Sequence, residues 1–186
     1  VSGDITNDGR IDLHVGSNYG TQGLLSLNGS TYQTISGKGS FGGTNSTTDN
    51  TNTRSVLNQL EINNTATATS NVVWNVPVTR IKSNLIFTNA RVNVTTGNRF
   101  VIGNFGNLLS SNLVCNSGSG FTNGLVSKWL LSGNTYNVTP GTEYPGLHND
   151  SNPYRYPFIS PTGTDRTFYV LPDALAVKGG EIAILY

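Results

Sequence analysis

The 186-residue chain has little charge, one cysteine and no methionine. Lys, Arg, Asp and Glu make up 11% of the residues, against about 25% in ordinary soluble domains. The net charge of +1 argues against nucleic acid or an anionic membrane surface as a partner. A single cysteine, Cys115, excludes an internal disulfide. Its apolar neighbours in "NLVCN" predict a small buried core residue.

Two further absences concern membranes and processing. No run of about eighteen apolar residues occurs, so we expect no membrane-inserted segment. The chain starts at Val1 and shows no signal peptide. We therefore expect a processed chain or a segment of a longer protein.

Sequence signatures of catalysis are also missing. The chain contains no G-x-S-x-G, H-E-x-x-H, P-loop or Cys-x-x-Cys motif. Its few carboxylates form no recognisable catalytic pair of the kind that hydrolysis of a glycoside needs. We therefore predict that the protein is not an enzyme and has no cofactor.

What the sequence has in abundance is Gly, Asn, Ser and Thr, residues of turns and of solvent-facing strand positions. Disorder usually accompanies high net charge and few aromatics, whereas aromatics make up 9% here. Short runs of alternating apolar and polar residues recur, and most end in Asn- or Gly-containing turns. We predict an all-β fold. The residues expected to face inward are Leu25, Leu27, Tyr32, Ile35, Leu60, Ile62, Val76, Leu85, Phe87, Val92, Val94, Val101 and Val114.

The spacing of the runs suggests a repeat. Leu60 and Ile62 are followed 25 positions later by Leu85 and Phe87. A coarse period in the twenties is typical of a parallel β-helix, in which inward positions stack from coil to coil. An antiparallel β-sandwich with tight hairpins permits the same spacing. Periodicity alone leaves both open. Asn suits the corners of a β-helix, because it tolerates left-handed backbone and its amide can bond turn carbonyls.

The amino-acid composition of the chain changes near residue 121. More than half of the aromatic residues and six of the seven prolines come after it. We predict a β-helix-like repeat region at 1–120 and an antiparallel, aromatic- and Pro-rich β module or cap at 121–186. The segment 42–55 has no large apolar residue and is expected to be a surface excursion.

Several phrases resemble those of a known group of proteins. "LNGSTYQTISGKGSF", "LNQLEINN" and "FTNGLVSKW" resemble repeated phrases in large secreted surface proteins of Bacteroidota, while "VTPGTEYPG" and "YRYPFIS" match only loosely. The resemblance covers most of residues 20–170. It implies a repetitive, adhesin-like β-helical exoprotein exported by the type IX route, and so favours the β-helix-like core over the sandwich. It supplies no catalytic motif.

The segment "GDITNDGRIDL" (3–13) resembles a calcium-binding loop. Asp4, Asp8 and Asp12 fall at ligand positions, but Val15 stands where a bidentate carboxylate is needed. We favour a strand turn, with weak Ca²⁺ binding as the alternative. In that turn the inward-facing residues are Ile5, Ile11 and Leu13.

The loop at 142–156 is the densest polar and aromatic segment. Sugar recognition needs flat aromatic faces together with amides and carboxylates for the hydroxyls. A structural cap with tyrosines packed under prolines would have the same composition. The candidate ligand-binding residues are Tyr144, Tyr154 and Tyr156 for stacking, and Asn149, Asp150 and Asn152 for hydroxyls.

These patterns favour a non-enzymatic extracellular protein with a structural or adhesive role, as a segment of a larger adhesin or surface filament. Its expected partners are other surface proteins, copies of itself or glycans. The alternatives are a carbohydrate-binding module, a polysaccharide-active β-helix enzyme, and a viral capsid or fibre protein. Because the chain has so little charge, binding or assembly is expected to depend little on salt.

Overall fold

The computed structural model describes residues 1–11, 13, 23–41, 56–102, 112–130, 149–150, 155–170 and 180–186. In these ranges the chain forms strands and no helix, which confirms the predicted all-β class. They accordingly include no helix long and apolar enough to cross a bilayer. The predicted surface excursion at 42–55 lies outside the described residues.

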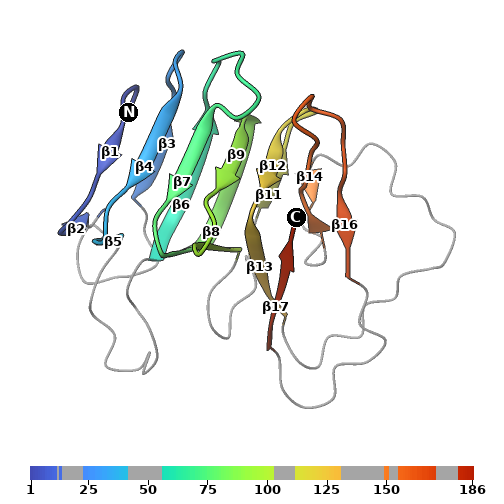
Figure 1. The fold of residues 1–186 in the computed structure, drawn as a ribbon. Helices are drawn as coiled ribbons and strands as arrows, with labels where there is room; N and C mark the ends of the chain where they lie inside the picture. Colours follow the sequence, from blue (N-terminus) through green and yellow to red (C-terminus); the bar gives the residue numbers. More distant parts are fainter. Residues whose placement is uncertain are drawn as a thin grey trace, which may run out of the picture.

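The described residues form seventeen strands, most of them short. In Figure 1 the strands follow one another across the molecule from β1 and β2, near the N-terminus, to β17, β14 and β16, and strands of different sheets overlap in this view. Their bounds are β1 (Ile5–Thr6), β2 (Arg10–Ile11), β3 (Leu24–Leu27), β4 (Gln33–Ser36), β5 (Ser40–Phe41), β6 (Val56–Asn63), β7 (Val72–Asn75), β8 (Val78–Asn89), β9 (Arg91–Val94), β10 (Arg99–Ile102), β11 (Asn112–Cys115), β12 (Gly120–Asn123), β13 (Leu125–Leu130), β14 (Asn149–Asp150), β15 (Arg155–Tyr156), β16 (Phe168–Tyr169) and β17 (Gly180–Leu185).

Most strands belong to two sheets. The first has five strands in the order β1-β4-β7-β9-β12, and all its pairs are parallel. The second has eight strands, in which β3, β6, β8, β10, β11 and β13 pair in parallel. Antiparallel partners β14 and β17 lie at the ends of this second sheet. Parallel pairing thus extends to Lys128, beyond residue 120, and the later strands pair antiparallel.

The register confirms the spacing seen in the sequence. Leu60 pairs with Leu85 and Ile62 with Phe87, the predicted shift of 25 positions. Each pair belongs to a longer column of buried side chains, since facing positions on neighbouring parallel strands share one side of a sheet. The first column is Leu25, Leu60, Leu85 and Leu113, and the second is Leu27, Ile62, Phe87 and Cys115.

Three of the predicted inward positions need correction. Val114 is only half-buried, because the register that pairs Leu113 with Leu85 turns Val114 outward. Tyr32 is 53% exposed, since it precedes β4 and the buried alternation starts only at the next residue. Val101 is buried but lies outside the central cluster, to which Phe100 on the other side of β10 contributes. The other predicted inward residues are buried, as is Cys115.

Aromatic rings form a continuous contact series through the core. Trp74 contacts Phe41 and Phe100 at ring-centroid distances of 6.1 and 5.4 Å. Phe100 contacts Phe121 at 5.0 Å, and Phe121 contacts Phe158 at 6.4 Å. The buried indole N–H of Trp74 donates to Thr79 Oγ1 at 2.9 Å, so this large side chain leaves no polar group unpaired.

Buried amides occupy the corners where the chain passes between the sheets. Asn64 Nδ2 donates to Thr31 O at 2.8 Å and to Gln33 Oε1 at 2.7 Å. Asn71 Nδ2 donates to Asn64 O at 2.6 Å, and Asn71 Oδ1 accepts from the Arg91 N–H at 2.8 Å. The prediction that Asn amides satisfy turn carbonyls is therefore confirmed at these corners.

A glycine is required at the turn from β12 to β13. Gly124 has φ of +110°, and a Cβ there would lie 2.2 Å from Val94 O. Only glycine adopts this backbone without strain. The turn thereby places β12 in one sheet and β13 in the other.

Candidate functional site

In the predicted metal-binding segment, the two carboxylates that the structure describes accept hydrogen bonds from backbone N–H groups of the protein itself. Asp4 Oδ1 accepts from the Thr34 N–H at 2.7 Å, and Asp8 Oδ1 accepts from the Lys38 N–H at 3.1 Å. Asp12 lies outside the described residues. In the described part of the chain no group of three His, Cys, Asp or Glu side chains could hold a metal ion. These two hydrogen bonds link the segment around β1 to β4 and to the turn that follows β4.

The favoured alternative for this segment, a strand turn, agrees with the structure. Ile5 and Ile11 lie on β1 and β2, which pair in parallel with β4 and β5. Both side chains, together with Leu13, pack against the core cluster. The segment therefore closes the N-terminal end of the core.

Residues of the predicted glycan loop are only partly described. Tyr144, Asn152 and Tyr154 lie outside the described residues. Asn149 and Asp150 form β14, which pairs antiparallel with Leu113 and Val114 of β11. Only Tyr156, on β15, has a described side chain.

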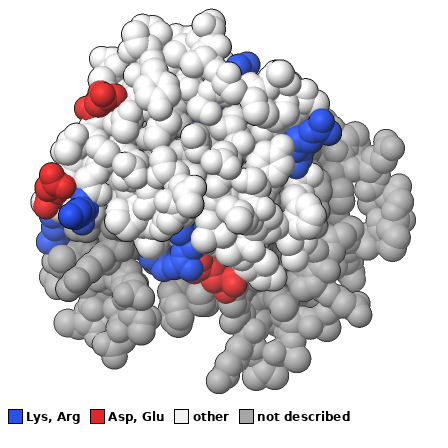
Figure 2. Space-filling view, viewed as in Figure 1, with Lys and Arg blue, Asp and Glu red and all other residues white. Residues whose placement is uncertain are grey.

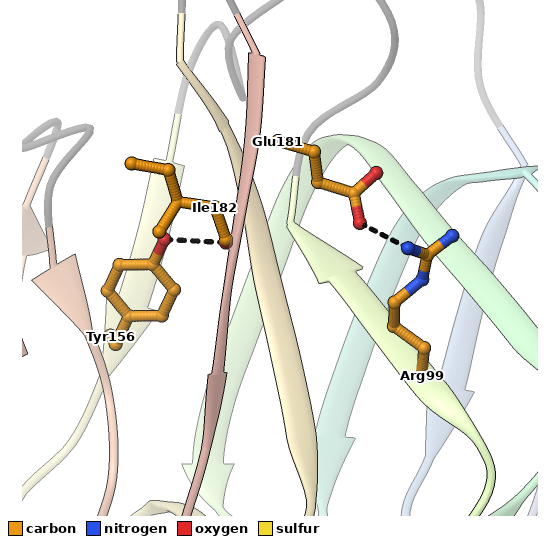
Figure 3. A network of polar contacts seen from close by, with 4 residues as sticks. All are labelled: Arg99, Tyr156, Glu181 and Ile182. Carbon is orange, nitrogen blue, oxygen red and sulfur yellow. Dashed lines mark hydrogen bonds and ion pairs between the residues drawn. The ribbon is translucent and has the colours of Figure 1, made fainter.

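Tyr156 is buried rather than exposed, with 0% of its surface accessible. Its hydroxyl donates to Ile182 O at 2.8 Å (Figure 3), and its ring stacks on Phe158 at 6.4 Å. Burial raises the pKa of the Tyr156 phenol above its ordinary value, with the negative charge of Glu181 acting in the same direction. Tyr156 therefore offers no open ring face to a sugar. The stacking role predicted for it is wrong, because its ring fills the core beneath β17.

Polar contacts around Tyr156 fasten β17 to the rest of the molecule. Arg99 Nη1 and Glu181 Oε1 lie 3.0 Å apart and join β10 to β17 (Figure 3). Lys128 is 97% buried, its Nζ donates to Arg155 O at 2.7 Å, and it lies 5.9 Å from the centre of the Tyr156 ring. We name Arg99, Lys128, Tyr156 and Glu181 the β17 clasp. Sequence reasoning missed the clasp, although a lysine inside the apolar run "LVSKWLL" was a signal for it.

Exposed polar side chains form rows across the strands of the five-stranded sheet. The Thr6 and Ser36 hydroxyls lie 3.4 Å apart on β1 and β4. Thr95 Oγ1 donates to Asn75 Oδ1 at 2.8 Å. Asn123 Nδ2 donates to Asn93 Oδ1 at 3.1 Å. We call this surface the outer polar face. Its polar outward positions are Thr6, Thr34, Ser36, Asn75, Asn93, Thr95 and Asn123, and the apolar Val73 lies between Thr34 and Asn93.

The second sheet carries similar pairs. Ser26 Oγ donates to Glu61 Oε2 at 2.9 Å, and Asn84 Nδ2 donates to Gln59 Oε1 at 2.9 Å. Such pairs hold the side chains in fixed positions, spaced by the distance of about 4.8 Å between neighbouring strands. On the side of the molecule drawn in Figure 2 charged side chains are few and scattered. The side drawn in Figure 2 therefore carries few charges, and the side-chain pairs described above hold polar groups in place on both sheets.

Comparisons with known proteins give no relative. No protein-family model, no curated protein and no solved structure matches this chain.

Proposed function

We propose that the protein is a non-enzymatic extracellular surface protein with a structural or adhesive role, and that its parallel strands are turns of a β-helix-like stack. The observation that carries the proposal is the pairing of most strands up to β10 with a later, parallel strand, accompanied by buried columns and exposed polar rows. Stacked units of this kind give long surfaces that suit attachment or spacing better than chemistry. The extracellular location and type IX export rest on the resemblance in the sequence alone.

The use of the acidic groups supports a structural role. Asp4 and Asp8 accept backbone N–H groups, Glu61 accepts from Ser26, and Glu181 pairs with Arg99. A catalytic carboxylate needs access to substrate and a pKa suited to its task. The partners of these four carboxylates instead link separate strands and turns of the fold to one another.

The outer polar face is the proposed contact surface. Its hydroxyls and amides are already held by one another, so contact with a polar target orders few additional side chains. The face is nearly neutral, so its attachment should rest on hydrogen bonding and contact area rather than charge.

Carbohydrate binding is the second candidate, and Tyr32 favours it. Its side chain is 53% exposed and lies two residues before Thr34 on the outer polar face. An exposed ring beside ordered hydroxyls and amides is the combination that sugars recognise. The sugar surface that we propose for this second candidate lies beside Tyr32, next to the five-stranded sheet.

A charge placed in the outer polar face tests the proposal. Asn75 is exposed on the central strand β7, so Asn75→Arg should reduce adhesion to cells or neutral glycan surfaces at least fivefold. Thr67→Arg, exposed in the connection between β6 and β7, is the matched control. Equal adhesion of both variants and the unaltered protein, with all three folded, would contradict a role for this face. A selective loss of glycan binding in Tyr32→Ala would favour the carbohydrate candidate.

A further inference from the structure

Tyr32 is an exposed aromatic residue on a firmly held part of the backbone. Its side chain is 53% exposed, whereas Gln33, the next residue, is fully buried. The Gln33 amide donates to Gly3 O at 2.9 Å, and its Oε1 accepts from Asn64 Nδ2 at 2.7 Å. On the other side of Tyr32, Thr31 O accepts from the same Asn64 amide at 2.8 Å. Hydrogen bonds thus fix the backbone on both sides of Tyr32, so that holding its ring against a ligand costs little further ordering.

Tyr32 belongs to the same side of β4 as the outer polar face. Side chains alternate between the two sides of a strand, and Gln33 and Ile35 are the buried set. Tyr32, Thr34 and Ser36 therefore occupy outward positions, and Tyr32 and Thr34 are about 6.6 Å apart along the strand. The Thr34 hydroxyl lies within reach of a sugar that stacks on the Tyr32 ring.

Asp4 supplies a carboxylate at the same place. It directly precedes β1, and the pairing of Ile5 with Ile35 sets it beside Thr34. Its side chain is exposed, and Oδ1 accepts from the Thr34 N–H at 2.7 Å, which fixes the carboxylate in position. A carboxylate has two acceptor oxygens, and its hydrogen bonds are among the stronger ones. The negative charge of Asp4 therefore favours neutral hydroxyl groups as ligands and disfavours anions.

From Thr34 a level row of outward positions crosses the five-stranded sheet. The next position is Val73, which at 9% exposure adds no bulk above the sheet, and Asn93 follows it. Asn123 Nδ2 donates to Asn93 Oδ1 at 3.1 Å, so that each of these amides is held by the other. Because neighbouring strands lie about 4.8 Å apart, the row from Thr34 to Asn123 spans roughly 14 Å. That span accommodates several linked sugar rings.

We propose that Tyr32, Asp4 and Thr34 form the anchoring subsite for an extended, neutral polysaccharide that runs across the strands. One sugar ring stacks on Tyr32, while its hydroxyls hydrogen-bond to Asp4 and Thr34. Later rings of the chain reach the amides of Asn93 and Asn123. This proposal rests on the carbohydrate candidate proposed above, and it names the class of sugar, the anchoring residues and the direction of the bound chain.

Pull-down of the full chain on beads that carry glucan, mannan or the anionic polymer polygalacturonate tests the proposal. The unaltered chain should bind a neutral polymer in preference to polygalacturonate. Tyr32→Ala should weaken that binding about fivefold or more, because it removes the stacking face, whereas Tyr32→Phe keeps the face and should bind like the unaltered chain. Phe168→Ala is the matched control, since it removes a ring that is 51% exposed on β16, and it should leave binding unchanged.

Asp4→Asn tests the class of sugar. This variant keeps an oxygen for the Thr34 N–H but loses the negative charge. Its preference for neutral over anionic polymer should therefore fall about threefold or more. An unchanged preference would show that Asp4 does not face the ligand and would overturn its place in the subsite.

Other results overturn the subsite as a whole. Failure of the unaltered chain to bind glucan or mannan does so, as does equal weakening by Tyr32→Ala and Phe168→Ala. Thermal melting shows that each variant is folded. Adhesion that Asn75→Arg reduces, in a chain that binds no polysaccharide, would refute the subsite alone and leave the proposed adhesive role standing. Polysaccharide binding that depends on Tyr32, together with adhesion that Asn75→Arg leaves unchanged, would support the subsite and refute that role of the outer polar face.

Discussion

At the scale of single residues, the molecule is organised by neutral side-chain amides. Asn64 and Asn71 each bond two successive segments of the chain, and Gln33 Nε2 reaches Gly3 O at 2.9 Å. Buried amides need all their partners, because an unpaired polar group in the interior is costly. Here the amides supply donors to corner carbonyls that face away from the sheets. Hydrogen bonds of these amides hold the corners in place, whereas packing of the apolar columns holds the sheets together.

Replacing Asn71 tests this role. In Asn71→Ala the Arg91 N–H and the Asn64 carbonyl lose the partner that Asn71 provides, while the Asn89 carbonyl keeps only its bond from the Asn64 N–H. The unfolding free energy should therefore fall by about 2–3 kcal/mol. Asn123→Ala, which removes an exposed bond to Asn93, should change it by less than about 0.5 kcal/mol. Urea denaturation followed by tryptophan fluorescence measures both. Similar losses in the two variants would mean that the corner amides are not specially important.

Tyr156 provides a pH-dependent test. Its pKa is raised in the folded state, mainly by burial, so folding favours the neutral phenol. That contribution is complete below the ordinary tyrosine pKa of about 10 and is lost as pH rises above it. Stability should therefore decline above about pH 10.

The variant Tyr156→Phe isolates this residue. It should lower stability at neutral pH by about 1 kcal/mol, through loss of the hydrogen bond to Ile182 O. The stability of this variant should also decline less steeply with rising alkaline pH than the stability of the unaltered protein does. Chemical denaturation at a series of pH values makes the comparison, and identical slopes would show that another group titrates.

At the scale of strands, register decides which residues are inside. In β11 the pairing with β8 turns Leu113 and Cys115 inward and Val114 outward. A shift of one residue would reverse all three. The apolar sequence "NLVC" is compatible with either orientation, and the column formed by Leu60 and Leu85 selects one of them.

Paired substitutions in β11 test the register. Leu113→Ala removes a side chain that is 2% exposed and should lower unfolding free energy by about 2–4 kcal/mol. Val114→Thr changes a half-buried side chain and should cost less than about 1 kcal/mol. Denaturation curves of both variants check the order. A larger effect at Val114 would reverse the assignment.

At the scale of the whole molecule, the stacking of parallel strands determines where polar and charged side chains lie. The parallel pairs place most polar side chains on lateral faces, where they bond one another and carry little charge. Antiparallel β17 follows the last parallel strand, and the β17 clasp holds it there through contacts from β10, β13 and β15. The result, in the part of the chain that the structure describes, is a stack of strands whose sides are polar and carry few charges.

Two measurements test this description of the whole molecule. Far-UV circular dichroism should show a β spectrum, and a third or more helix would contradict the fold. Binding of any partner, or association of copies, should change less than tenfold between low and physiological salt, because few counterions can be released from a surface with 11% charged residues. Titrating sodium chloride in a binding assay gives the second result.

The sequence by itself determined the all-β class, most of the core and the 25-position shift between Leu60 and Leu85. Those features depend on local alternation and turn chemistry, which neighbouring residues encode. It also indicated the corner amides, since Asn at the ends of the runs suits turns with buried carbonyls. The assignment of Tyr156 to a glycan-binding site was wrong, because the exposure of a ring depends on which other segments of the chain pack against it.

Only the tertiary structure decided the strand pairing, the outward turn of Val114 and the burial of Tyr156 beneath β17. Each depends on contacts between residues far apart in the chain, such as Arg99 with Glu181 and Tyr156 with Ile182. Such contacts leave no periodic trace in the sequence. Parallel and antiparallel pairing also share the same alternation of apolar and polar residues, so the direction of each partner is fixed only when the chain closes on itself.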